Sequence, residues 1–199
     1  QDQRHDEDQP EKDEDDPEYG DLNKIYHAAH NGAELVNRLL AFSRKLETKP
    51  IPINLNERIL MVEKLLKRTI PKMVTMEFDL AKTGTEITAD PTQIEQLLMN
   101  MAVNSSDAMP EGGILKFSTS RVFLDENFCR SHLQLKPGDY VRLQVSDSGQ
   151  GIDEQVIEHI FEPFYTTKEL GRGTGLGLAT VYGIVAEHEG LITCESRVG

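Results

Sequence analysis

Apolar and small residues recur at alternating spacings of three and four over the N-terminal part of the chain. The series is Leu22, Ile25, Ala29, Gly32, Val36, Leu39, Ser43 and Leu46. Such a seam is typical of a helix that packs lengthwise against a second helix. We predict a stem helix over residues 22–48, and its partner helix lies outside this sequence or is supplied by another chain.

A globular pattern begins after Lys49, where two prolines end the helical periodicity. The next helix, predicted over 56–69, has one apolar face formed by Ile59, Leu60, Val62, Leu65 and Leu66. Further elements are strands at 73–80 and 86–89 and a helix that Asp90 and Pro91 open and the turn 110–113 ends.

Strict alternation then predicts two strands that pair as a hairpin. Their buried positions are Leu115, Phe117 and Thr119 on one strand and Val141, Leu143 and Val145 on the other. An insertion at 124–138 separates them, and no role for it follows from its residues. The remaining predicted elements are a short helix at 154–160, a glycine-rich segment, a helix at 175–189 and a strand from Leu191 that stops, apparently truncated, at Gly199.

This order of elements predicts an α+β domain over residues 49–199, with a mixed, mostly antiparallel sheet covered by helices. The 199 residues suffice for one domain of this kind plus an appendage.

Charge is unevenly distributed along the chain. Residues 1–21 hold eleven acids against Arg4 and Lys12, so they carry −9 of the formal net charge of −13. Because this stretch has almost no apolar side chains to bury, we expect it to be a flexible acidic segment. The remaining net charge of −4 argues against a nucleic-acid-binding protein that uses a clustered basic face.

Two further classes are excluded by composition. No apolar run approaches the roughly 20 residues of a membrane span, so we expect no membrane contact within this sequence and a cytoplasmic location, with any anchor of a parent protein outside it. Cys129 and Cys194 are too few and too far apart for a disulfide framework or a zinc site.

Three segments concentrate residues that a core does not need. The first is Asn100 and Asn104, four residues apart on an otherwise apolar helix. Such a pair can simply bridge neighbouring loops by hydrogen bonds. Alternatively, an Asn oxygen can complete the octahedral shell of Mg²⁺ beside phosphate oxygens and waters.

The second segment is Asp147-Ser-Gly-Gln-Gly151, directly after a predicted strand. Gly149 and Gly151 allow close approach of the backbone, and an Asp carboxylate at a strand end can accept a hydrogen bond from an exocyclic amine such as adenine N6. An ordinary Asp-Ser-Gly turn is the alternative interpretation.

The third segment, 171–178, has a glycine at every second position and leads straight into an apolar helix. Backbone amides at such a helix start can bind phosphate. The segment lacks the Lys and hydroxyl of a Walker A loop and does not follow a strand as a dinucleotide-binding fold requires.

Together and in this order, the three segments resemble the N, G1 and G2 boxes of the GHKL ATP-binding superfamily, and residues 161–168 resemble the F box of sensor histidine kinases. The helix at 28–45 resembles the second helix of the kinase dimerisation hairpin, especially in hybrid kinases. The resemblance covers about residues 22–199 and implies a Bergerat fold, a two-layer α/β sandwich after the stem helix.

The resemblance also implies an activity and partners. A sensor histidine kinase transfers the γ-phosphoryl group of ATP to a histidine on a dimerisation hairpin, for relay to the receiver domain of a response regulator. ATP and Mg²⁺ are the implied ligands, and the implied full-length protein is a homodimer. For this chain, with half of the hairpin, we expect a monomer or weak dimer.

Site roles follow from the matched motifs. Asn104 would hold Mg²⁺, Asn100 would support the phosphate side, and Asp147 would bind the adenine amine. Lys168 and Arg172 would neutralise phosphate charge, and Asn100, Asn104 and Lys168 form the implied catalytic set. The other implied nucleotide-binding residues are Asp107, Gly149, Gly151, Ile152, Phe161, Phe164, Gly173, Thr174, Gly175, Leu176, Gly177 and Leu178.

Some positions depart from the family pattern. No histidine here matches the family's phosphoacceptor, and His5 lies in the acidic segment. Asp107 stands where many sensor kinases have a basic phosphate contact. The superfamily's ATPases carry a water-activating Glu at the position of Asn100. An Asn cannot act as a base, so we expect slow ATP hydrolysis. The alternatives are a noncatalytic GHKL regulatory module and a slow GHKL ATPase.

Overall fold

The computed structural model describes residues 48–168 and 173–199. Three of the predicted features lie outside the described residues. They are the acidic segment 1–21, the stem helix predicted over 22–48 except for residue 48, and Arg172. Every element below belongs to the compact unit Glu47–Gly199.

The described helices and strands follow the predicted order closely. They are β1 (Ile51–Asn54), α2 (Leu55–Thr69), β2 (Val74–Asp79), β3 (Glu86–Ala89), α3 (Pro91–Asp107), β4 (Gly113–Leu124), α4 (Glu126–Arg130), β5 (Gly138–Asp147), α5 (Glu154–Ile157) and α6 (Gly177–Glu187). None of these helices is both long and apolar enough to cross a membrane.

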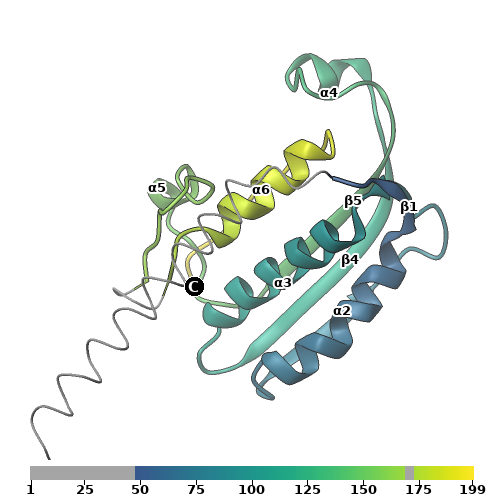
Figure 1. The fold of residues 1–199 in the computed structure, drawn as a ribbon. Coiled ribbons are helices and arrows are strands. Elements are labelled where there is room, and N and C mark those ends of the chain that lie inside the picture. Colours follow the sequence, from purple (N-terminus) through teal and green to yellow (C-terminus); the bar gives the residue numbers. More distant parts are fainter. Residues whose placement is uncertain (1–47, 169–172) are drawn as a thin grey trace, which may run out of the picture. The chain divides into compact units, whose positions relative to one another are not determined.

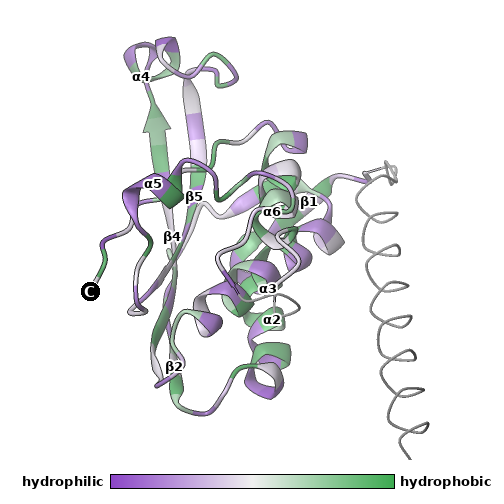
Figure 2. Ribbon diagram, turned by 90° about the vertical axis from the view of Figure 1, so that its left-hand side faces the viewer, coloured by the Kyte–Doolittle hydropathy of each residue, from purple (hydrophilic) through white to green (hydrophobic). Residues whose placement is uncertain are grey.

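A three-stranded sheet of order β2-β4-β5 forms one layer of the domain. β2 runs parallel to β4, and β4 pairs antiparallel with β5, with Phe117 opposite Val145 as the alternation predicts. Helices α2, α3 and α6 lie together on one face of this sheet (Figures 1 and 2). The predicted two-layer α+β architecture with a mixed sheet is therefore confirmed.

β1 and β3 form a separate antiparallel pair in which Pro52 lies opposite Thr88. β1 was not predicted from the sequence. A proline lacks the N–H that a strand ladder needs, so it argues against a strand. It is tolerated in β1 because, among the described residues, β1 pairs with β3 alone and its other edge needs no ladder hydrogen bonds.

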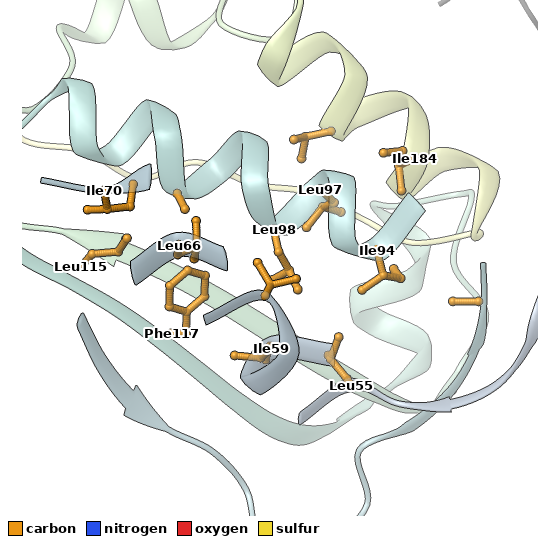
Figure 3. Close-up of a cluster of buried hydrophobic side chains, with 14 of the residues drawn as sticks. Leu55, Ile59, Leu66, Ile70, Ile94, Leu97, Leu98, Leu115, Phe117 and Ile184 are labelled. Carbon is orange, nitrogen blue, oxygen red and sulfur yellow. The ribbon is translucent and has the colours of Figure 1, made fainter. Parts of the chain in front are cut away.

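The core fills the space between the helices and the sheet. Figure 3 shows Leu98 from α3 and Phe117 from β4 pointing into one cluster with side chains of α2. The rings of Phe78 and Phe117 stack with centroids 5.6 Å apart. This packing fixes α3, which carries Asn100 and Asn104, against the sheet.

One face of α2 is narrower than predicted. Leu55, Ile59, Val62 and Leu66 are buried, but Leu60 and Leu65 are 44% and 50% exposed, so the buried face does not include all five predicted apolar positions. Positions 59, 62 and 66 lie along one line of the helix, whereas 60 and 65 lie on its flanks, beyond the reach of the sheet.

The strand predicted from Leu191 is absent: residues 190–199 belong to no helix or strand. A strand requires a regular ladder, whereas this segment makes isolated bonds, such as Gly199 N to Gln150 O at 3.4 Å. Two other bounds also differ: α6 begins two residues after Gly175, whose φ is +64°, and α5 ends at Ile157.

The insertion at 124–138 contains α4, which Asp125 caps by accepting a hydrogen bond from Phe128 N at 2.8 Å. It sits at the tip of the β4–β5 hairpin, which extends past the helical layer (Figure 1). Residues 147–151, at the other end of β5, are therefore remote from this insertion.

Candidate functional site

The two asparagines of α3 meet the first residue of α6. Asn100 Nδ2 donates a hydrogen bond to Gly177 O at 3.3 Å. A Cβ atom placed on Gly177 would lie 3.2 Å from Asn104 Nδ2. Both asparagines are half-buried, so the structure brings the predicted N and G2 segments together on one face of α3.

The start of α6 carries free backbone donors. Leu176 precedes the helix and is buried, and within the part of the chain that the structure describes no side chain caps the helix by a hydrogen bond. Thr174 Oγ1 accepts a bond from Leu176 N at 3.4 Å, which tightens the approach to the helix. Uncapped N–H groups and the positive end of the helix dipole favour an anion at this position.

The segment from Asp147 to Gly151 forms a tight turn after β5. Asp147 Oδ1 accepts a bond from Gly149 N at 3.0 Å, and Gln150 N donates to Ala108 O at 3.1 Å. A Cβ atom on Gly149 would lie 2.7 Å from Ala108 O. The turn therefore packs on the C-terminal end of α3, and it needs glycine there because the two backbones touch.

Asp147 thus satisfies both interpretations that the sequence left open. Its Oδ1 stabilises the turn, and the residue is exposed. A carboxylate has two oxygens with several acceptor positions, so an adenine amine can bind to Asp147 while the turn stays intact.

The C-terminal segment lies over the same turn. Gly151 has φ of +75°, and a Cβ atom there would collide with the Arg197 carbonyl. Ile152, half-buried, donates its N–H to Ser196 Oγ at 2.8 Å. Burial, and then the negative charges of Asp147 and Glu195, raise the pKa of the Cys194 thiol.

This position of Cys194 and Ser196 beside the Asp147 turn was missed by sequence reasoning. A single cysteine and a single serine in a short terminal segment carry no spacing signal. Only the three-dimensional return of the chain to residues 150–152 shows the contact.

The F-box segment folds back toward the glycine-rich run. Phe164 N donates to Gly175 O at 2.9 Å, and Phe164 and Gly175 have φ of +70° and +64°. A Cβ atom on Gly175 would lie 2.3 Å from the Phe164 carbonyl carbon. Positive φ costs energy for a phenylalanine but not for a glycine. The close approach of the two backbones therefore requires glycine at position 175.

One aromatic contact completes this region. The rings of Phe161 and Tyr182 lie with centroids 5.8 Å apart at 38°, which links the segment to α6. The Phe164 side chain is 55% exposed and is not packed into the core. Leu178, in the first turn of α6, is half-buried.

Lys168 places a cation between the end of α3 and the glycine-rich run. Its ammonium group pairs with Asp107 Oδ2 at 2.5 Å. A Cβ atom on Gly173 would lie 3.1 Å from Lys168 Cδ, so the side chain runs beside the glycine segment. The pairing with Asp107, the last residue of α3, was not predicted.

The predicted site residues therefore gather around the C-terminal half of α3 and the start of α6. Arg172 is outside the described residues and stays a prediction. Within 48–168 and 173–199, no three His, Cys, Asp or Glu side chains cluster as a metal site. The predicted Mg²⁺ position relies on Asn104 instead.

Comparisons with known proteins agree with this geometry. Residues 89–199, more than half of the chain, match the family described as histidine kinase-, DNA gyrase B-, and HSP90-like ATPase. The sensor kinase CckA of Brucella abortus is 41% identical over 184 residues, which cover 92% of this chain and 20% of that kinase. The chain thus spans about a fifth of the length of that relative.

Solved structures show the same fold. The nucleotide-free catalytic domain of the histidine kinase ThkA is 31% identical, with a TM-score of 0.54 over 70% of this chain and 82% of that chain. ThkA in complex with the response regulator protein TrrA gives a TM-score of 0.61 at 27% identity, over 88% of this chain and 47% of that chain. The chain belongs to the histidine kinase-, DNA gyrase B-, and HSP90-like ATPase family, as an ATP-binding catalytic domain of the sensor histidine kinase type.

Proposed function

We propose that this chain binds ATP between α3 and α6 and transfers its γ-phosphoryl group to a histidine on a dimerisation hairpin. The hairpin belongs to the full-length protein, a homodimer, or to a partner kinase, and the phosphoryl group passes on to the receiver domain of a response regulator. The observation that carries this proposal is the meeting of Asn100, Asn104 and Gly177, which joins the N and G2 segments.

In this proposal the turn after β5 binds adenine. Asp147 accepts the exocyclic amine while Gly149 and Gly151 leave room for the base. Ile152 lies at the end of this turn. This arrangement distinguishes adenine from guanine, because the carboxylate requires a donor at that position.

The start of α6 binds the phosphate groups in this proposal. The N–H groups in the first turn of α6 would bind the negative charge, and Lys168 would add a cation. Mg²⁺, when bound, would neutralise charge on the phosphate oxygens, with the Asn104 side-chain oxygen as its protein ligand. Asn100 holds the first residue of α6 in place through its bond to Gly177 O.

Phosphoryl transfer depends mainly on positioning and on charge neutralisation, and these residues supply both. Hydrolysis requires a group that activates water. Asn100 cannot act as a base, and its amide is already bonded to α6, so the geometry supports transfer over hydrolysis.

The response regulator partner is supported by ThkA, which was crystallised with a response regulator protein. The fold match extends over 88% of this chain. We extend this partner class to the present chain as part of the proposal.

The first test is ATP binding by calorimetry for the whole chain and for Asp147→Ala. Losing a hydrogen bond to a charged group costs about 1.5–3 kcal/mol, so affinity should fall by about 10- to 100-fold. Asp139→Ala is the matched control, because Asp139 is an exposed carboxylate at the opposite end of β5. It should bind ATP as the unaltered chain does.

The second step supplies a separate dimerisation hairpin that contains an acceptor histidine, with ATP and Mg²⁺. Transfer of the γ-phosphoryl group to the hairpin supports the kinase. Binding without transfer would favour the regulatory module, and rapid phosphate release without the hairpin would favour an ATPase. Absence of ATP binding would refute the site assignment.

A further inference from the structure

The ion pair between Asp107 and Lys168 joins the end of α3 to the F-box segment. The two atoms, Lys168 Nζ and Asp107 Oδ2, are 2.5 Å apart, and the side chains are 35% and 46% exposed. The residues are 61 positions apart in the sequence, so the pair is a tertiary contact. It lies at the edge of the region proposed to receive phosphate.

Asp107 is unfavourable where it stands in its own helix. It is the last residue of α3, whose final turn holds no basic side chain. The negative end of the helix dipole disfavours an acid there. Residues that break a local rule without local compensation are expected at functional positions, and here the compensation comes from Lys168.

Lys168 is held so that it can reach more than one partner. Its backbone N–H donates to Thr166 Oγ1 at 3.2 Å, which fixes the start of the side chain. Its aliphatic part runs beside Gly173, which lies four residues before the first residue of α6. A flexible side chain of four methylenes that starts here lies within reach of an anion at the start of α6.

Asp107 is also on the same side of α3 as Asn104. Residues three apart on a helix are neighbours on its surface, and Asn104 contacts Gly177. A phosphate group near Asn104 would therefore meet the Asp107 carboxylate as well as the ammonium group of Lys168. The carboxylate repels phosphate and occupies its cation.

We propose that Asp107 is a positioning residue that holds Lys168 when nucleotide is absent and competes with nucleotide phosphate for its ammonium group. The inference rests on the proposed ATP site. Binding of nucleotide exchanges one anionic partner of Lys168 for another, so the net gain from this lysine is smaller than for an unpaired one. Asp107 thereby weakens nucleotide binding through Lys168.

The test measures the dissociation constants of ATP, ADP and adenosine for the whole chain, with and without Mg²⁺, at one fixed salt concentration. Exposed ion pairs contribute up to about 1 kcal/mol, so Asp107→Asn should bind ATP and ADP about two- to fivefold more tightly. Adenosine binding should not change, because adenosine has no phosphate.

Two variants separate action through Lys168 from simple repulsion. Lys168→Met should weaken ATP binding, and in that background Asp107→Asn should lose most of its gain, as expected for coupled residues in a double-mutant cycle. Asp107→Glu keeps the carboxylate and should return the affinity toward that of the unaltered chain.

Asp139→Asn is the matched control. It removes one exposed carboxylate from an ion pair with Arg121, 2.9 Å long, on the β4–β5 hairpin. It changes the net charge by the same amount and should leave all three affinities unchanged. Circular dichroism of each variant verifies that the fold is retained.

Several results would overturn the proposal. An equal gain from Asp107→Asn in the Lys168→Met background would show direct repulsion only. A loss of ATP affinity confined to Mg²⁺-containing buffer would show that Asp107 assists the metal. No gain in a chain that binds ATP refutes this inference alone, whereas no ATP binding by the unaltered chain refutes the proposed function too.

Discussion

Gly177 leaves little room for a side chain beside Asn104. A Cβ atom there would lie 3.2 Å from Asn104 Nδ2, which is closer than ordinary contact. Gly177→Ala should displace the asparagine and weaken ATP binding about three- to tenfold, equivalent to about 0.7–1.4 kcal/mol. Stability should hold or rise, because alanine favours a helix over glycine by up to about 1 kcal/mol. Calorimetry and thermal unfolding measure the two effects.

Gly183, in the same helix, provides the control for Gly177. A Cβ atom on Gly183 meets nothing within 4 Å. Gly183→Ala should therefore raise the unfolding free energy by about 0.5–1 kcal/mol and leave ATP affinity unchanged. Equal ATP affinity in Gly177→Ala and Gly183→Ala would contradict the role given to Asn104.

The individual site residues were predictable where a spacing marked them. Asn104 and Asp147 stood out because polar residues interrupted apolar patterns at fixed intervals. The partner of Lys168 was not predictable, since 34 acids compete for any cation in this sequence. His188 had no assigned partner, yet its Nε2 accepts a bond from Asp90 N at 2.9 Å, and its Nδ1 lies 2.8 Å from Ile184 O.

The helix α3 depends on its N-cap, Asp90. Its carboxylate accepts bonds from Thr92 N and Gln93 N at 2.9 and 3.3 Å and from Lys49 N at 3.0 Å. Asp90→Ala should lower the unfolding free energy by about 1–2 kcal/mol, as for other N-caps. Chemical denaturation at neutral pH measures the loss.

The Asp90 cap should also depend on pH. The hydrogen bond from Lys49 N, followed by those from Gln93 N and Thr92 N, lowers the pKa of Asp90 below its ordinary value of 3.8. A lowered folded-state pKa means that the stabilisation is complete above 3.8 and is lost as the pH falls through the folded-state pKa. This part of the acid dependence should be missing in Asp90→Ala.

Asp125→Ala is the comparison for Asp90. It removes the cap of α4, a helix of five residues at the hairpin tip. Because α4 packs little of the core, the change should cost less than about 0.5 kcal/mol. If Asp125→Ala lowered the unfolding free energy as much as Asp90→Ala does, the packing of the capped helix would not decide how much its cap contributes.

Element prediction succeeded where the period was long and regular, as for α3 and the β4–β5 hairpin. It failed where a partner decides the outcome. β1 forms despite Pro52 because β3 pairs with it, and the apolar segment from Leu191 forms no strand although its residues favour one. Pairing depends on backbone groups elsewhere in the chain, which local periodicity does not report.

For the whole molecule, the sequence placed a domain boundary near residue 49, and the compact unit that holds the described residues begins at Glu47. The predicted boundary rests on the shift from a helical seam to short alternating strands, and it stays a prediction. The roles of residues 1–21 as an acidic segment and of residues 22–48 as a stem helix stay predictions, because residues 1–47 lie outside the described structure.

A chain of residues 48–199 should fold alone and bind ATP. The described members of the main hydrophobic cluster lie between Ile53 and Ile192, so the truncation removes none of these. We expect one cooperative unfolding transition and an ATP affinity within about twofold of the whole chain, because the described contacts of the site are all made by residues that this chain keeps. Calorimetry and denaturation test both.

A shorter chain of residues 55–199 makes this test sharper. It removes β1, including the buried Ile53, and the Asn54 side chain that caps α2 by accepting from Glu57 N at 3.2 Å. Loss of a buried isoleucine and a cap together should cost about 3–6 kcal/mol, which is a large part of the stability of a domain this size. Equal stability of the two truncated chains would contradict the placement of β1 in the domain, and failure of 48–199 alone to bind ATP would show that the site needs residues before 48.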